Sequence, residues 1–343
     1  MDATSRARDR SGTRALDLAL RFLQAGPVVI LVLLCVVIAL AKPVFLSTIN
    51  IQNVLMQSSV VAVLAIGLLV VVLTGGIDLS IGSTMALATV IGWEVYQWVG
   101  DAGAVLVVGS MVALGLVVGI ANGVLYVVGR VPHPLVVTLA MLSIVQSIGL
   151  VITHGQPMSG MPGLVNSLGR GFIGPVPIPA IAVAVVALAA GVFLRRTQWG
   201  RWTYAVGGDV EAARRMSIPV PLVLISAYAV CGSLAGFAGV LVAGNINSAS
   251  ATIGQAAGGL LDAVAAVIIG GASILGGRGT VWNCLIGALL IGVIRNGLAL
   301  GGASPFLQGL LVGATILVAV ELDVVRTVIE RRIRTIQANV GAM

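Results

Sequence analysis

Residues 50–82 read NIQNVLMQSSVVAVLAIGLLVVVLTGGIDLSIG, and this stretch decides the fold class. No charged residue occurs between Asn50 and Leu73, a length that as a helix can cross about 30 Å of hydrocarbon. The run then breaks at Gly75-Gly76 and a lone acid, Asp78, before a second apolar run begins at Ile81. This pattern predicts membrane-spanning helices joined by short polar turns.

The composition of the whole chain also indicates a membrane protein. Hydrophobic residues make up 58% and charged residues 9% of the 343 residues, against roughly 25% charged in an ordinary soluble domain. This polar surface is too small for a soluble enzyme, a disordered chain or a secreted disulfide scaffold. Three cysteines lie within apolar runs without metal-ligand spacing, so they are expected to be small buried side chains.

Ten apolar segments are long enough to be predicted as spans, and the eighth is the shortest. They run near residues 24–42, 50–73, 81–99, 103–128, 134–153, 175–194, 220–243, 257–271, 281–300 and 304–322. The predicted fold class is therefore all-α, a polytopic membrane helix bundle of about ten transmembrane helices. We divide the chain into a basic tail 1–23, a transmembrane domain 24–322 with a polar loop 195–219, and a basic tail 323–343.

The basic residues predict the orientation of the chain. With a cytoplasmic N-terminus, sixteen of the nineteen Lys and Arg fall on the cytoplasmic side, Lys42 and Arg170 fall outside, and Arg295 lies within a span. Cytoplasmic loops carry such an excess. We therefore expect an even number of spans with both termini cytoplasmic, and we attribute the net charge of +7 to topology rather than to nucleic-acid binding. Ala39-Leu40-Ala41 resembles a signal cleavage site, but cleavage there would leave an odd number of spans.

The longest polar segment between spans is residues 195–219, RRTQWGRWTYAVGGDVEAARRMSIP. Asp209 is placed to cap a short helix that has Glu211 in its first turn and Arg214 after it, an order that suits the helix dipole. Such a short charged helix at the cytoplasmic face is suited to binding another protein. The alternative is an interfacial helix that lies on anionic lipid.

Two turns share a pattern of adjacent glycines followed by an aspartate. In the first, Gly75-Gly76-Ile77-Asp78, either Asp78 or the nearby Ser80 is placed to cap the next helix, to line a passage, or to do both. The second, Gly258-Gly259-Leu260-Leu261-Asp262, follows five spans later and on the opposite side of the membrane. That placement is what an inverted repeat of two five-helix halves would produce.

Glycine has two further roles in the sequence. The i, i+4 spacings Gly115, Gly119, Gly123 and Gly232, Gly236 predict closely packed helices. The segment 270–279, GGASILGGRG, superficially resembles a phosphate-binding loop, but it has Gly277 where such a loop needs lysine and no strand before it. No catalytic constellation is recognisable, so we expect a chain that is not an enzyme and binds no cofactor or metal.

Three segments in register resemble the permease subunits of bacterial ATP-binding-cassette importers for ribose, xylose, arabinose and related monosaccharides. They are residues 74–82, residues 204–214, and residues 261–273 together with 276–279. The resemblance extends from about residue 45 to 322. It implies a second permease copy or a sister permease, an ATPase with two nucleotide-binding domains that uses ATP and Mg, and a periplasmic or lipid-anchored sugar-binding protein.

The resemblance also assigns site residues. The cytoplasmic loop is similar to the coupling segment that docks in the ATPase, which places that role on Gly207, Gly208, Asp209, Glu211, Ala212, Ala213 and Arg214. Four positions depart from the family pattern. The family usually has asparagine at Asp209, glycine at Ser217, glutamate at Leu260 and asparagine at Arg295, and the last two departures leave the sugar preference open.

We therefore expect a multi-pass protein of the bacterial inner membrane that moves a pentose or similar polyol by alternating access. The expected lining of its pathway is Asn53, Gln57, Asp78, Ser80 and Asp262. Two alternatives stay open. One is a stand-alone secondary transporter or channel with a broken helix at Gly75-Gly76. The other is a membrane assembly or signalling protein without transport activity.

Overall fold

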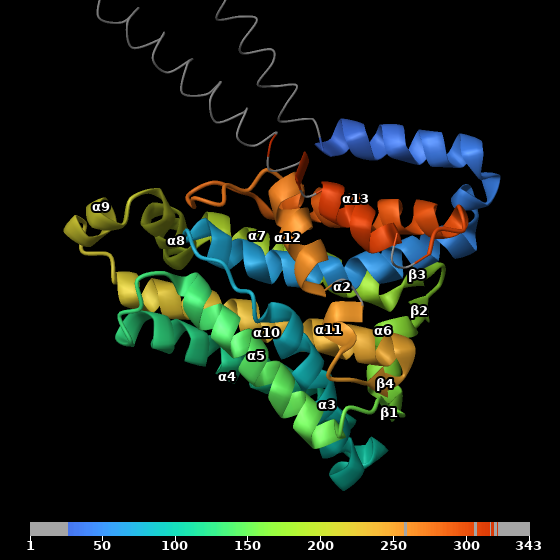
Figure 1. The fold of residues 1–343 in the computed structure, drawn as a ribbon, viewed down its shortest axis with the longest axis horizontal. Helices are drawn as coiled ribbons and strands as arrows, with labels where there is room; N and C mark the ends of the chain where they lie inside the picture. The colour runs from blue at the N-terminus through green and yellow to red at the C-terminus, as the bar shows by residue number, and fades with distance from the viewer. Residues whose placement is uncertain (1–26, 257–258, 305–306, 316, 319–320, 322–343) are drawn as a thin grey trace, which may run out of the picture.

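The computed structural model describes residues 27–256, 259–304, 307–315, 317–318 and 321 (Figure 1). The predicted basic tails 1–23 and 323–343 lie outside the described residues. After an apolar helix Pro27–Ala41, the elements are η1 Pro43–Leu46, α2 Thr48–Leu73, α3 Ile81–Val99, η2 Asp101–Gly103, α4 Ala104–Val128, α5 Pro134–Thr153, β1 Met158–Ser159, α6 Gly163–Arg170, β2 Phe172–Ile173, β3 Val176–Pro177, α7 Ile178–Arg196, α8 Gln198–Gly208, α9 Val210–Arg215, α10 Val220–Ile246, β4 Ser248–Ala249, α11 Ile253–Ala256, α12 Gly259–Ile269 and α13 Val281–Leu300.

Each predicted span up to residue 300 coincides with a described helix. Six helices of the described chain are long and apolar enough to cross a membrane: α2, α4 with the turn before it, α5, α7, α10 and α13. The helix Pro27–Ala41 and α12 are apolar but shorter, and α3 carries Glu94 near its end. The described part of the last predicted span, 304–322, is helical over 307–315. The chain is a multi-pass membrane protein built from helices.

α2 forms the centre of the bundle. Every residue from Val61 to Leu73 is buried, and α7, α10, α12 and α13 pack around the helix (Figure 1). A helix that is apolar all round must be covered by protein or lipid on every side. Here the neighbouring helices provide that cover, so residues 61–73 of this uncharged run lie inside the bundle rather than against lipid.

α4 and α10 approach each other through glycines, as the sequence predicts. A Cβ atom on Gly115 would overlap the carbonyl oxygen of Gly232, and a Cβ on Gly232 would overlap that of Gly115. Gly119 faces the Tyr228 backbone in the same way. Without side chains at these positions the two backbones lie in contact, and this confirms the predicted packing stripe.

The two halves of the chain repeat one packing pattern. α10 contacts α3 and α4 as α2 contacts α12 and α13, and the pair α3–α4 corresponds to the pair α12–α13. α2 runs antiparallel to α10, because Gly67 lies beside Cys231 whereas Gly76, just beyond the end of α2, lies beside the side chain of the earlier residue Tyr228. Corresponding helices that run in opposite directions are what an inverted repeat requires, so the packing supports the predicted repeat.

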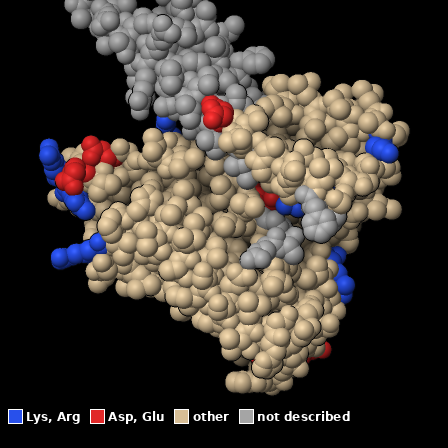
Figure 2. Space-filling view, in the orientation of Figure 1, with Lys and Arg blue, Asp and Glu red and all other residues tan. Residues whose placement is uncertain are grey.

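The two ends of the bundle differ in character. At one end β1 pairs with β4, β2 pairs with β3, and α6 lies beside them (Figure 1). These strands have two residues each and are a small departure from the all-α expectation. The opposite end carries α8 and α9, and Figure 2 shows charged side chains gathered there beside a broad surface without charge. We call this the α8–α9 end.

Candidate coupling site and translocation pathway

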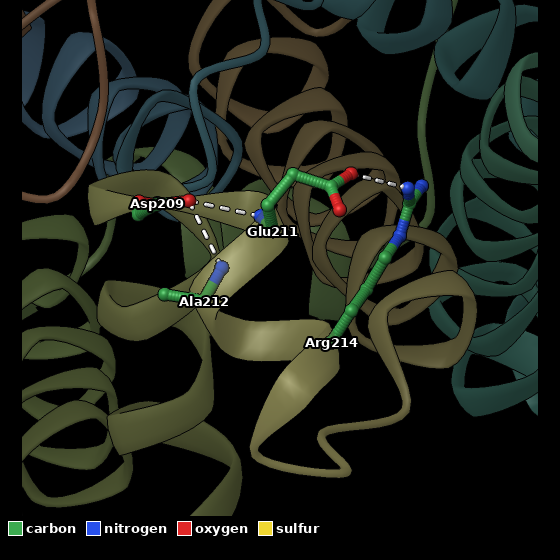
Figure 3. A network of polar contacts seen from close by, with 4 residues as sticks. All are labelled: Asp209, Glu211, Ala212 and Arg214. Atoms are coloured by element: carbon green, nitrogen blue, oxygen red, sulfur yellow. Dashed lines mark hydrogen bonds and ion pairs between the residues drawn. The ribbon is translucent and has the colours of Figure 1, made fainter.

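α9 is a short helix with a defined cap at its start. The Asp209 Oδ1 atom accepts hydrogen bonds from the backbone N–H groups of Glu211 at 2.9 Å and Ala212 at 3.0 Å (Figure 3). The Arg214 Nη1 atom donates to the Glu211 Oε1 atom at 2.7 Å. Asp209 therefore caps α9 as the sequence predicts, and the two charged side chains after it form an exposed ion pair.

The end of α9 is also fixed by backbone hydrogen bonds. Ile218 N–H donates to the Ala213 carbonyl at 3.1 Å and Ser217 N–H donates to the Arg214 carbonyl at 3.0 Å, the two bonds of a Schellman motif. Ser217 takes φ +60°, a left-handed conformation that glycine adopts more easily. The motif explains why glycine suits this position, and serine here carries some conformational strain.

α9 is anchored by one face and exposed on the other. Ala213 is buried against Val206, Val220 and Val223. Glu211, Ala212 and Arg214 are exposed, and Gly208 has open space around its Cβ position. The helix is therefore a small projection whose outer surface carries the charged side chains of Glu211 and Arg214 together with the exposed apolar side chains of Val210 and Met216.

Gly207 lies where three distant segments meet. A Cβ atom there would overlap the Leu73 carbonyl oxygen at the end of α2 and would lie 2.7 Å from the Gly277 nitrogen. Gly277 N–H in turn donates to that same Leu73 carbonyl at 2.9 Å. The segments 74–82, 204–214 and 270–279, which the sequence singles out separately, thus come together at the α8–α9 end.

Tyr204 adds a side-chain contact to this junction. Its hydroxyl donates to the Gly279 carbonyl at 2.8 Å. Burial raises the pKa of the Tyr204 phenol, and the nearby Arg195 charge partly offsets this, so the hydroxyl stays a donor. The glycines of the 270–279 loop serve this close backbone packing, so displacing α8 and α9 would strain both the α2 end and that loop.

Asp78 lies in a buried polar cluster at the start of α3. Its Oδ1 atom accepts from the Ser80 N–H at 2.9 Å and the Ser80 hydroxyl at 2.7 Å. Asn122 on α4 donates from Nδ2 to the Ser80 Oγ atom at 2.8 Å. Ser80 is the N-cap residue of α3 but its side chain accepts no capping bond, so of the two predicted capping residues Ser80 does not cap the helix, whereas Asp78 accepts from the backbone N–H of the N-cap residue. The Ser80 hydroxyl is occupied by Asp78 and Asn122 instead.

Asp262 in the second half forms an ion pair with Arg295 on α13. The Arg295 Nη2 atom donates to the Asp262 Oδ1 atom at 2.8 Å, and Nε lies 2.7 Å from Oδ2. The Asp262 side chain is fully buried, whereas 23% of the Arg295 side chain is exposed. Arg295 thus turns toward the interior of the bundle.

The five residues predicted to line the pathway lie in three separate places. Asn53 and Gln57 are exposed on the first half of α2, roughly 24 to 30 Å along the helix axis from its end at Leu73. Asp78 and Ser80 lie beyond that end in one cluster, and Asp262 lies on α12. The structure joins Asp78 to Ser80 but does not join either of them to the other three.

A small hollow lies between the start of α3, near residues 79–86, and the segment of residues 251–260 that leads into α12. It has about 50 Å³ of space and is lined by Leu79, Gly82, Ser83, Gln146, Gly254 and Leu260, among others. A Cβ atom on Gly254 would overlap the Gly82 carbonyl oxygen, so the two backbones close upon each other here. The hollow is far below the roughly 300 Å³ at which binding sites for drug-sized ligands begin. In this conformation it is too small to hold a sugar.

Sequence reasoning missed the partners of the two acids. Asn122 is uncharged in an apolar helix, and its role emerges only from the α3–α4 packing. The departure from the family pattern at Arg295 does not by itself reveal its ion pair with Asp262. The signal was available, because an acid and a base on neighbouring spans are expected to pair within a membrane. Within the described residues no group of three or more His, Cys, Asp or Glu could hold a metal ion.

Comparisons with known proteins agree on one family. The family described as "Branched-chain amino acid transport system / permease component" matches residues 50–320. The ribose import permease protein RbsC of Escherichia coli (strain K12) is 38% identical over 328 residues, which cover 91% of this chain and 97% of that protein. RbsC of Bacillus subtilis (strain 168) is 37% identical over 308 residues, covering 87% and 92%.

A relative with a different sugar in its name matches over a similar length. The galactose/methyl galactoside import permease protein MglC of Salmonella typhimurium is 33% identical over 317 residues, covering 88% of this chain and 94% of that protein. No solved structure matches the chain. The helical membrane architecture, the capped α9 and these full-length similarities lead to one conclusion, which is that this chain belongs to the transport-system permease family.

Proposed function

We propose that this chain is the membrane-spanning permease subunit of an ATP-binding-cassette importer for a small neutral monosaccharide such as ribose. Family membership and the sugar-import names of relatives that align over nearly the whole chain support the class. The variety of those names, ribose and galactose, is the reason to propose a class of sugar rather than one sugar.

The α8–α9 end is proposed to be the cytoplasmic end, where a separate ATPase docks on α9. The single observation that carries this step is the arrangement of α9, a small projection with an exposed Glu211–Arg214 pair on a base joined to α2 and to the 270–279 loop. The seven predicted coupling residues all lie in this projection or its base. A push or pull on α9 would therefore reach both halves of the bundle through Gly207.

The proposed partners follow from the same mechanism. The ATPase supplies two nucleotide-binding domains and uses ATP and Mg, since this chain is proposed to bind neither. A second permease copy or a sister permease completes the route, and an extracytoplasmic binding protein delivers the sugar. Under this proposal the protein lies in the bacterial inner membrane with both termini in the cytoplasm.

The test is ATP-dependent sugar uptake into proteoliposomes that contain the permease, the ATPase and the loaded binding protein. Glu211→Lys replaces one member of an exposed ion pair worth only about 0.5 kcal/mol, so folding is expected to be unchanged. Uptake should nevertheless fall severalfold, because the charge on the docking face is reversed. Wild-type uptake by this variant would refute docking on α9.

A second liposome experiment distinguishes this proposal from its main alternative, a stand-alone secondary transporter. Liposomes that contain only this chain should not accumulate sugar under an ion gradient. Accumulation there would identify a secondary transporter and contradict the proposal.

A further inference from the structure

Arg295 lies at a defined depth in the bundle. On α13 it lies between Gly292, which packs against Ser58, and Asn296, which exchanges hydrogen bonds with Asn50 at 2.8 and 3.0 Å. Its backbone is therefore level with the segment of α2 from Asn50 to Ser58, in the half of the membrane away from α8 and α9.

The same segment of α2 exposes two amides. Asn53 and Gln57 are one helical turn apart and both are exposed. Amide groups are costly to place against hydrocarbon without hydrogen-bond partners. Asn53, Gln57 and Arg295 thus lie at one depth in the bundle, and each of them is at least partly exposed and carries hydrogen-bonding groups.

The guanidinium of Arg295 is only partly used by its partner. Asp262, which is fully buried, accepts a hydrogen bond from Nη2 and lies 2.7 Å from Nε as an ion-pair contact, and this holds the guanidinium in place. In the described part of the chain no residue accepts a hydrogen bond from Nη1. Among the described residues, the two N–H groups of Nη1 thus have no acceptor, and a charged group at this depth faces protein or water rather than lipid.

The Asp262–Arg295 ion pair also determines the net charge at this depth of the bundle. Asp262 compensates the charge of Arg295, so the pair offers fixed donors with no net charge. Such a site suits hydroxyl and ring oxygens of a neutral polyhydroxylated compound better than a sugar acid or a sugar phosphate, which would need an uncompensated cation.

We propose that Arg295 is a specificity-determining contact for the transported solute, that its Nη1 atom donates hydrogen bonds to oxygens of a neutral monosaccharide, and that Asp262 is its positioning residue. This inference rests on the proposed function. Asn53 and Gln57 extend the same contact level along α2.

The test replaces the ion pair by apolar side chains, Asp262→Leu with Arg295→Met, in the complete transporter. Buried ion pairs can be exchanged for apolar residues of similar size with little loss of stability, so this variant is expected to fold. Uptake of radiolabelled ribose and galactose and the accompanying ATP hydrolysis are measured together. We expect the sugar moved per ATP to fall roughly tenfold, the effect of losing one or two hydrogen bonds, while ATP hydrolysis stays at the wild-type rate.

Two further variants keep the test decisive. Asn50→Leu with Asn296→Leu removes a buried polar pair at the same depth, and its sugar-to-ATP ratio should be unchanged. Arg295→Lys keeps the charge but loses the planar fork, and its ratio should fall roughly threefold, which tests the proposal even if the apolar pair does not fold.

Each outcome has one reading. A wild-type ratio in either Arg295 variant, with the wild-type protein active, overturns the inference alone. A fall in both the Arg295 and the Asn50–Asn296 variants also overturns it, because the effect is then general packing. Failure of the wild-type protein to transport either sugar overturns the proposed function and this inference with it.

Discussion

Each half of the chain holds a buried acid near the start of a corresponding helix, Asp78 just before α3 and Asp262 in the first turn of α12, and the two acids are used differently. In the first half Asp78 is surrounded by neutral groups, the Ser80 hydroxyl and the Asn122 amide, and all three are buried. In the second half Asp262 is buried beneath an arginine that is partly open. The first half thus holds a closed cluster of buried groups, and the second half holds an ion pair that is partly open. Similar sequence patterns in the two halves therefore do not imply equal roles.

The largest expected effect separates the two acids. Asp262→Asn leaves the Arg295 charge without its partner, at an expected loss of about 3 to 5 kcal/mol in the free energy of unfolding. Asp78→Asn keeps an oxygen acceptor for Ser80, so its loss should be about 1 kcal/mol. Thermal unfolding of both variants in detergent measures the difference.

The apolar pair is the control for this comparison. Asp262→Leu with Arg295→Met should unfold close to the wild-type temperature, because no unpaired charge remains. Equal destabilisation by Asp78→Asn and Asp262→Asn would mean that the two clusters do not differ as described.

A second change breaks the junction between the halves. Gly207→Ala places a methyl group against the Leu73 carbonyl oxygen and close to the Gly277 nitrogen, so we expect a loss of about 2 to 3 kcal/mol and of ATP-dependent uptake. Gly208→Ala is the matched control, since open space surrounds its Cβ position and only a small change in unfolding temperature is expected. Similar behaviour of the two variants would show that the three segments are not packed at Gly207.

The smallest expected effect is a gain in the free energy of unfolding. Ser217 adopts φ +60° at the end of α9, so Ser217→Gly relieves that strain and should stabilise the protein by up to about 1 kcal/mol. The gain should appear as a slightly higher unfolding temperature with unchanged uptake. Destabilisation instead would show that flexibility added to the unfolded chain outweighs the relief at this position.

Local features of this structure were predictable from sequence, and distant ones were not. The Asp209 cap depends on residues within one helical turn, and the break after α2 depends on the left-handed conformation of Gly75, at φ +82°. The apolar runs likewise identify where helices form. Each of these rests on physical effects that neighbouring residues decide.

The meeting of three segments at Gly207 depends instead on how helices pack. Gly277 and Leu73 are about two hundred residues apart in the sequence, and periodicity says nothing of their contact. The Ser80 cap failed for a related reason, since the competing partner Asn122 comes from another helix. Docking on α9 and the pathway lining stay predictions for experiment.

The central claim is that α9 lies in the cytoplasm, where an ATPase can reach it. The most direct measurement is labelling of Glu211→Cys with a membrane-impermeant maleimide, in a background without the three native cysteines. We predict labelling in inside-out vesicles but not in intact cells, with protection when the ATPase is bound, while Arg170→Cys shows the opposite sidedness. Labelling of Glu211→Cys from outside intact cells would contradict the account.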